Sequence, residues 1–196
     1  MTRRIVFASR NRQKFEEMRF LFQDFPVELL FGGDFSALAV EETGDSYSAN
    51  ALLKARAWAE EVRLPALGDD SGLEVEALAW GPGLLSARVA PSDKERIAWL
   101  LERLGGQTTR TARFVAALAC FFPEEGCFFL SRGVCTGSIA HVPQGERGFG
   151  YDPIFIPDGY EKSFGLLGED VKARISHRAR AVFHMKDMLF NRTVLE

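Results

Sequence analysis

The sequence predicts a mixed α/β or α+β fold in which helices accompany a mixed sheet. In the first half of the chain, short apolar runs typical of buried strands alternate with segments of helical periodicity. Further along, residues 111–122 and 127–135 read as two long strands. With 196 residues, 46% hydrophobic and 26% charged, the chain can bury a core as one domain or as two small lobes.

The first half of the chain begins with a strand, a helix and a second strand. Residues 4–8 read as a short buried strand, and residues 9–22 place Phe15, Met18 and Phe22 on related faces of a helix. A strand is expected at 27–31. Residues 46–62 are rich in helix formers and stop before Pro65, which predicts a second helix.

The next segments are predicted to alternate between extended chain, turn and helix. Residues 66–68 read as the end of a strand, 69–72 as a turn and 73–78 as a further extended segment. Ser92 and Glu95 have the spacing of a capping box, so we expect a helix from there to about Leu104.

The last third of the chain is predicted to contain a hairpin and a final helix. A PEEG turn separates the strands at 111–122 and 127–135, and 137–142 is a possible third strand. Ser176 is a plausible N-cap for a helix that runs toward Phe190. We treat residues 1–196 as one domain with two lobes.

Composition and charge exclude several classes of protein. The formal net charge of −3 provides no general positive field for a nucleic-acid backbone, so any anion site must be local. The three cysteines show no CxxC spacing, which argues against a disulfide scaffold or zinc ribbon and favours a reducing compartment. The longest apolar run, 114–122, is too short to span a membrane, and no secretory leader is evident, so we expect a cytoplasmic protein.

Two predicted helices begin with basic residues, although a helix N-terminus favours anions. At the first start, Arg10, Arg12 and Lys14 lie beside Asn11. At the second start, Lys172 and Arg174 precede the helix, and His177, Arg178 and Arg180 lie in its first residues. A bound phosphate would turn this repulsion into attraction. The alternative is a pair of solvated basic turns.

Acidic residues supply the complementary half of a magnesium–nucleotide site. Glu41 and Glu42 precede a Thr-Gly pair, and Asp69 and Asp70 follow an apolar run. Mg²⁺ commonly takes one or two carboxylates together with water and phosphate oxygens. Successive strand residues point to opposite faces, so only one of the two aspartates would face the site unless a turn has begun. The alternative is an ordinary turn.

The segment GFGYDPIF, residues 148–155, is a candidate base-binding loop. Its glycines permit close approach of the backbone, while Phe149 and Tyr151 offer flat faces and Asp152 a polar group. Such aromatic residues beside glycines can also be purely structural. The sequence contains no P-loop, HExxH, GxGxxG or GxSxG motif.

Seven motifs in this order resemble the inosine triphosphate pyrophosphatase family: SRNRQK, EETG, NALLKA, DDSGLEV, GPGLLSAR, GFGYDPIF and SHRARA. The resemblance covers nearly the whole chain. It implies an elongated two-lobed fold with a long mixed central sheet, a cleft between the lobes and a homodimer. It also implies Mg²⁺-dependent hydrolysis of the purine nucleoside triphosphates ITP, dITP and XTP to monophosphate and pyrophosphate.

The resemblance assigns a role to each matching position. The first motif would bind phosphate, Asp70 would be the catalytic and metal-associated carboxylate, and Glu41 best matches the second metal carboxylate, with Glu42 as the alternative register. The substrate-binding positions are Ser9, Arg10, Asn11, Arg12, Gln13, Lys14, Ser71, Phe149, Gly150, Tyr151, Asp152, Lys172, His177 and Arg178. Two features depart from the family pattern, namely arginines at the spacer positions 10 and 12 and the sequence SFGLLGEDVK that ends at Lys172.

Two other classes remain open. One is a regulatory module that binds the triphosphate without cleaving it. The other is a nucleic-acid-binding protein that uses its excess of arginine over lysine, although the acidic balance and the lack of a basic stripe argue against it.

Overall fold

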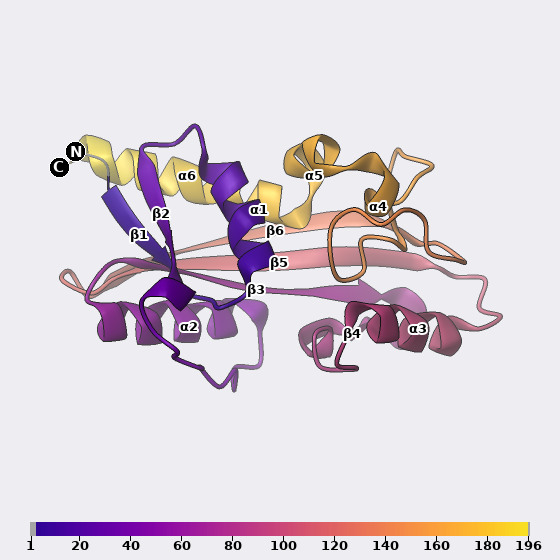
Figure 1. Cartoon of the computed structure of the whole chain (residues 1–196). Coiled ribbons are helices and arrows are strands. Elements are labelled where there is room, and N and C mark those ends of the chain that lie inside the picture. Colours follow the sequence, from indigo (N-terminus) through magenta and orange to yellow (C-terminus); the bar gives the residue numbers. More distant parts are fainter. Residues whose placement is uncertain (1–2, 196) are drawn as a thin grey trace. The chain divides into compact units, whose positions relative to one another are not determined.

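The computed structural model describes residues 3–195, and side chains as far as Phe190. Its strands are β1 (Arg3–Phe7), β2 (Val27–Phe31), β3 (Ala66–Val75), β4 (Gly81–Pro82), β5 (Thr111–Phe122), β6 (Cys127–Ile139) and β7 (Phe155–Pro157). Its α-helices are α1 (Arg12–Phe22), α2 (Tyr47–Val62), α3 (Asp93–Leu104), α4 (Phe164–Leu167), α5 (Glu169–Ile175) and α6 (His177–Leu195) (Figure 1). Short 3₁₀ turns η1, η2 and η3 cover Gly32–Asp34, Glu76–Leu78 and Gly83–Leu85. Within the described residues, no helix is both long and apolar enough to cross a bilayer.

The strands form one mixed sheet in the order β2-β1-β3-β5-β6-β7, and β4 pairs with β3. Strand β1 runs parallel to both β2 and β3, whereas the β3–β4 and β6–β7 pairs are antiparallel. Parallel strands need a crossover connection, which α1 supplies from β1 to β2, and α2 from β2 to β3 on the other side of β1. The predicted mixed α/β fold is therefore confirmed.

The chain divides into two compact units. Unit 1 consists of Met1–Asp70, Ala116–Gly133 and Arg178–Glu196, and unit 2 consists of Ser71–Val115 and Val134–His177. The boundaries fall inside β3, β5, β6 and α6, so these four elements contribute residues to both units.

Unit 1 has apolar residues on both faces of its strands. Phe7 and Leu118 pack with Met18 of α1 and Met185 of α6 in one cluster, while Val6, Ala117 and Ala119 pack with α2 in another. Adjacent strand residues enter different clusters because their side chains point to opposite faces. Figure 1 shows the result, with α2 on one side of the strands and α1 and α6 on the other.

Unit 2 has one core cluster, in which α3 packs on strand residues. Leu100 and Leu104 of α3 lie with Leu73, Phe114 and Phe155 in this cluster. The helix starts where the capping box predicted it, since the Ser92 side chain accepts from the Glu95 N–H and the Glu95 carboxylate accepts from the Ser92 N–H.

The predicted turn at residues 69–72 is wrong, because β3 continues without interruption from Ala66 to Val75. The place of β3 in the sheet, between β1 and β5, and its close packing on α2 at Gly68 override the turn propensity of the DDSG sequence. A Cβ at Gly68 would collide with the backbone carbonyl oxygen of Ala51, so this strand and α2 approach as closely as a glycine allows.

Two other strand predictions are also wrong. Residues 137–139 belong to the continuous strand β6 rather than to a separate strand, and β7 pairs alongside them. Residues 76–78 form the turn η2 instead of extended chain. The strand at 27–31 and the helix that follows the N-cap Ser46 lie where the sequence predicted them.

Candidate functional site

The continuous strand β3 sends its two adjacent aspartates to opposite faces of unit 1. Asp69 shares a face with Leu67, which packs with α1 and α6, and Asp70 shares a face with Ala66, which packs with α2. Both aspartates are buried. Each therefore meets a different set of charged groups.

Asp69 binds two cations from different helices. The Lys14 Nζ of α1 donates to one carboxylate oxygen at 2.7 Å, and the Arg178 Nε of α6 donates to the other at 3.2 Å. Arg178 also donates from Nη1 to the Glu17 carboxylate at 2.9 Å. Burial alone would raise the pKa of Asp69, but the charges of Arg178 and Lys14 outweigh it and hold that pKa well below its ordinary value. Asp69 is thus an ionised anchor for both cations.

Asp70 shares a single cation with a second carboxylate. The Lys54 Nζ of α2 lies 2.5 Å from Glu42 Oε1 and 3.1 Å from Asp70 Oδ1. The Asn50 amide donates to Asp70 Oδ2 at 3.3 Å, and its Oδ1 accepts from the Gly44 N–H at 2.8 Å. Burial raises the pKa of Asp70 above its ordinary value, with Glu42 adding to the effect and Lys54 opposing it.

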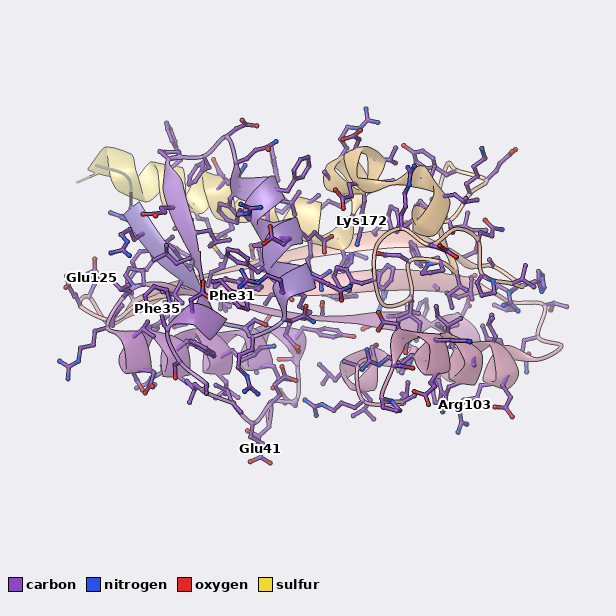
Figure 2. All side chains as sticks on the ribbon, in the orientation of Figure 1. Phe31, Phe35, Glu41, Arg103, Glu125 and Lys172 are labelled. Atoms are coloured by element: carbon purple, nitrogen blue, oxygen red, sulfur yellow. The ribbon has the colours of Figure 1, made fainter. Side chains whose placement is uncertain are left out.

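The structure places Glu42, rather than Glu41, beside Asp70. Figure 2 shows Glu41 at the outer edge of the loop that precedes α2, where its side chain points away from the helix. Glu42 is half-buried and contacts Lys54. Of the two registers that the sequence left open, the geometry favours Glu42 as the partner of Asp70.

Two carboxylates are a sufficient protein contribution to a Mg²⁺ site, because this ion usually keeps waters and takes substrate phosphate oxygens as its other ligands. Among the described residues there is no group of three or more histidine, cysteine, aspartate or glutamate side chains that could hold a metal. Glu42 and Asp70 already bind one positively charged group together, the ammonium of Lys54. This donor set suits a hard, partly hydrated ion better than a transition metal held in an all-protein cage.

The start of α1 is built by Asn11, the N-cap residue. Its side-chain oxygen accepts from the Lys14 N–H at 3.0 Å, and its own N–H donates to Ser9 Oγ at 3.0 Å. The first turn of α1, which is fully described, contains no acidic residue. Arg10 and Gln13 are exposed at this helix start.

Arg12 makes contacts within unit 1 that account for its position. Its guanidinium lies 3.7 Å from the centre of the Phe31 ring and 3.4 Å from the Asp34 carboxylate. These contacts fasten the start of α1 to the end of β2 and the following turn. The structure therefore gives Arg12 a structural contact in addition to the phosphate-binding role expected from the sequence.

In unit 2, Asp152 organises the glycine-rich loop. One of its carboxylate oxygens accepts from the Phe149 N–H at 2.9 Å and from the buried Lys172 Nζ of α5 at 2.7 Å (Lys172 is labelled in Figure 2). The Lys172 ammonium also lies 4.6 Å from the centre of the Phe149 ring. A Cβ at Gly148, whose φ is +79°, would meet the Asp152 carboxylate. The loop is therefore closed around one buried ion pair.

Two further contacts hold this loop in unit 2. The Gly150 N–H donates to the Asp93 carboxylate of α3 at 2.7 Å, and the Tyr151 hydroxyl donates to the Ser86 carbonyl oxygen at 2.9 Å. Tyr151 is buried in the core, and desolvation raises its pKa to about 12. It thus holds the loop in place, and its ring is not an open face for a base.

The remaining predicted residues of unit 2 are Ser71 and His177. Ser71 is half-buried in β3, directly after Asp70. His177 is buried at the start of α6 and stacks on Phe114, with ring centres 4.6 Å apart.

The sequence reasoning assigned no role to Asn50, Lys54, Glu17 or Asp93. Asn50 and Lys54 are four residues apart on α2, on the side that also carries the buried Ala51 and Ala55. A lysine on the apolar side of a helix is the feature that could have identified them, because burying an ammonium requires a carboxylate partner. Glu17 offers no such local signal, because its partner Arg178 lies 161 residues further along the chain.

Comparisons with known proteins agree over nearly the full length. A sequence model of the Ham1 family matches residues 5–188. A dITP/XTP pyrophosphatase of Deinococcus deserti is 44% identical over 182 residues, covering 92% of this chain and 86% of the relative. One of Aquifex aeolicus is 37% identical over 200 residues, covering 96% and 97%. The structure of a HAM1 protein from Coxiella burnetii matches with a TM-score of 0.86 at 37% identity, covering 96% of this chain and 99% of the other.

Proposed function

Because this chain belongs to the Ham1 family, we propose that it hydrolyses the non-standard purine nucleoside triphosphates ITP, dITP and XTP. The products would be the nucleoside monophosphate and pyrophosphate. The names of the relatives from Deinococcus deserti and Aquifex aeolicus support this substrate class, as do the seven motifs of the sequence.

The observation that carries the proposal is the charge arrangement around the two aspartates of β3. Three helices of unit 1 each bring one cation to this pair: Lys14 from α1, Lys54 from α2 and Arg178 from α6. Such a density of paired positive and negative groups is costly to bury for stability alone. It suits a ligand that carries several negative charges together with a divalent cation.

We assign the phosphates to the start of α1 and to the lysines. A helix N-terminus without acidic residues attracts anions through its N–H groups and its dipole. Lys14 lies at this start and Lys54 close to Asp70, so both can offset phosphate charge. The family motif also assigns substrate binding to Lys172 of unit 2.

Mg²⁺ is the proposed metal, held by Asp70 and Glu42. When bound, it would neutralise charge on the phosphates and polarise the attacking water. Asp70 would orient that water and accept its proton. The water oxygen forms a bond to the α-phosphorus, the bond from that phosphorus to the bridging oxygen breaks, and pyrophosphate leaves with the electron pair.

Base choice is assigned to Phe149 for stacking and to donors near His177 and Arg178. These donors would meet the 6-oxo group of hypoxanthine or xanthine. Adenine carries an amino group at this position, so with ATP two donors would face each other and binding would be weak.

The test is pyrophosphate release measured with ITP, dITP, XTP, GTP and ATP, each with and without Mg²⁺. We expect release from the first three with Mg²⁺ and loss of release when the metal is removed. A preference for ATP would contradict the proposed substrate class. Binding of ITP without any release of pyrophosphate would instead favour a regulatory module.

We also propose a homodimer, as the family resemblance implies. Strand β6 exposes Phe128 and Leu130, whose exposed fractions of 46% and 38% are high for large apolar side chains. Light scattering at several protein concentrations would test this, and a monomeric mass throughout would contradict it. A cytoplasmic location stays a prediction from the cysteine pattern.

A further inference from the structure

Lys54 occupies the position between two carboxylates that a metal ion would need. Its ammonium lies within 3.1 Å of an oxygen of both Glu42 and Asp70. The three side chains are largely shielded, with exposed fractions of 12% for Lys54, 23% for Glu42 and 10% for Asp70. One shielded ammonium group therefore forms ion pairs with two carboxylates.

We propose that Lys54 is a built-in counter-ion of this acidic pair, which a divalent metal ion has to displace, and that Lys54 thereby keeps metal affinity low until a polyanion arrives. The inference rests on the proposed function, since it takes Glu42 and Asp70 as the metal-binding carboxylates. It adds to that function a group that competes with the metal, and it explains why the metal would bind tightly only together with a polyanion.

Competition follows from the shared oxygens. A metal ion and an ammonium both need the lone pairs of Glu42 Oε1 and Asp70 Oδ1, and two cations placed side by side at this distance repel strongly in a shielded site. The ammonium must therefore move away when the metal binds. Lys54 carries a flexible four-carbon chain, which makes such a movement sterically inexpensive.

Asp70 and the loop that carries Glu42 have a hydrogen-bonding partner that is independent of Lys54. Asn50 holds Asp70 Oδ2 by its amide group and holds the loop at Gly44 by its side-chain oxygen. This loop also carries Glu42. One asparagine therefore keeps the acidic pair near its metal-binding arrangement while Lys54 is displaced.

Linkage follows from the displacement. Once it has left the carboxylates, the Lys54 ammonium needs a new anion, and a polyphosphate supplies one. A polyanion that binds the released ammonium must raise metal affinity, and the metal must raise polyanion affinity by the same factor. The free protein would hold the metal weakly, and the metal and the polyanion would bind together.

The experiment measures Mn²⁺ affinity without nucleotide, by electron paramagnetic resonance, in the unaltered chain and in Lys54→Met. Loss of the competing ammonium should lower the Mn²⁺ dissociation constant at least about tenfold. Lys162→Met removes the same charge from an exposed residue and should leave the constant unchanged. Lys54→Arg keeps a positive charge and should bind Mn²⁺ no more tightly than the unaltered chain. Equal affinities in Lys54→Met and the unaltered chain would overturn the inference, as would tight binding by Lys54→Arg.

A crystal structure of the unaltered chain with Mn²⁺ keeps the inference testable if Lys54→Met fails to fold. We expect Mn²⁺ bound to Glu42 and Asp70, with the Lys54 Nζ more than about 4 Å from both carboxylates. Lys54 still paired with both residues beside the bound metal would refute displacement. The proposed function fails separately, by an absence of pyrophosphate release from ITP in the unaltered chain.

Discussion

Asp69 and Asp70 differ in their cationic partners. Asp69 forms ion pairs with both Lys14 and Arg178, which compensate its negative charge inside the protein. Asp70 pairs with Lys54, which it shares with Glu42. The pKa directions agree with this division, since the pKa of Asp69 is lowered and that of Asp70 is raised. Asp69 is therefore a positioning residue for two cations, and Asp70 is the carboxylate left for a metal and a water.

Replacing Asp70 by asparagine should remove activity and preserve the fold. Asparagine keeps the size of the side chain, and Lys54 retains Glu42 as a partner. Without the carboxylate, kcat for ITP should fall roughly 10²- to 10⁴-fold, the usual scale for a group that accepts a proton. The control Asp158→Asn changes an exposed carboxylate of unit 2 and should keep the activity. Retention of more than half the activity in Asp70→Asn would remove this residue from its assigned role.

Replacing Asp69 by asparagine should instead lower stability. Lys14 would lose its carboxylate and Arg178 one of two, and breaking a buried pair costs about 3–5 kcal/mol. Because the folded-state pKa of Asp69 is lowered, its stabilising contribution is complete above the unfolded pKa of about 3.9 and is lost as pH falls through the folded pKa. Urea unfolding between pH 3 and 7 should show a smaller acid loss in Asp69→Asn. Parallel curves for the two proteins would contradict this assignment.

At the scale of elements, two close packings position the charged residues. Helix α2 lies so close to β3 at Gly68 that Asn50 and Lys54 reach the aspartate two residues further along the strand. In unit 2, α3 begins with Asp93, which fixes the backbone of the glycine-rich loop at Gly150. Each charged group is thus placed by the start or the packing of a helix.

The packing of α2 on β3 predicts a large effect for Gly68→Ala. The new Cβ would overlap the backbone carbonyl oxygen of Ala51, and backbone atoms cannot move aside as a flexible side chain can. Overpacking of this kind costs about 1–3 kcal/mol, so thermal unfolding should occur several degrees lower. Gly106→Ala is a matched control, because its Cβ would meet no atom within 4 Å. Equal melting temperatures for the two variants would show that the contact at Gly68 can relax.

For the whole molecule, local sequence patterns predicted most elements but not how the strands continue. Periodicity located α1, helix-forming residues located α2 and the capping box at Ser92 located α3, because all of these signals depend on near neighbours in the sequence. The length of β3 could not be predicted, because it depends on the position of β3 between β1 and β5 in the sheet and on packing against α2. The same applies to Lys54, whose two partners lie 12 and 16 residues away. Motifs identified the family, whereas contacts between elements determine which charged residues form ion pairs with one another.

The continuity of the strands leads to a prediction about unfolding. Because β3, β5 and β6 each supply residues to both units, neither unit keeps complete strands if the other unfolds. We therefore expect residues 3–195 to behave as a single domain, with one calorimetric transition whose van't Hoff and calorimetric enthalpies agree. Leu118→Ala in the core of unit 1 and Leu100→Ala in the core of unit 2 should each cost about 2–5 kcal/mol and shift that one transition. Two separate transitions, each moved by only one of the substitutions, would instead show that the units unfold independently.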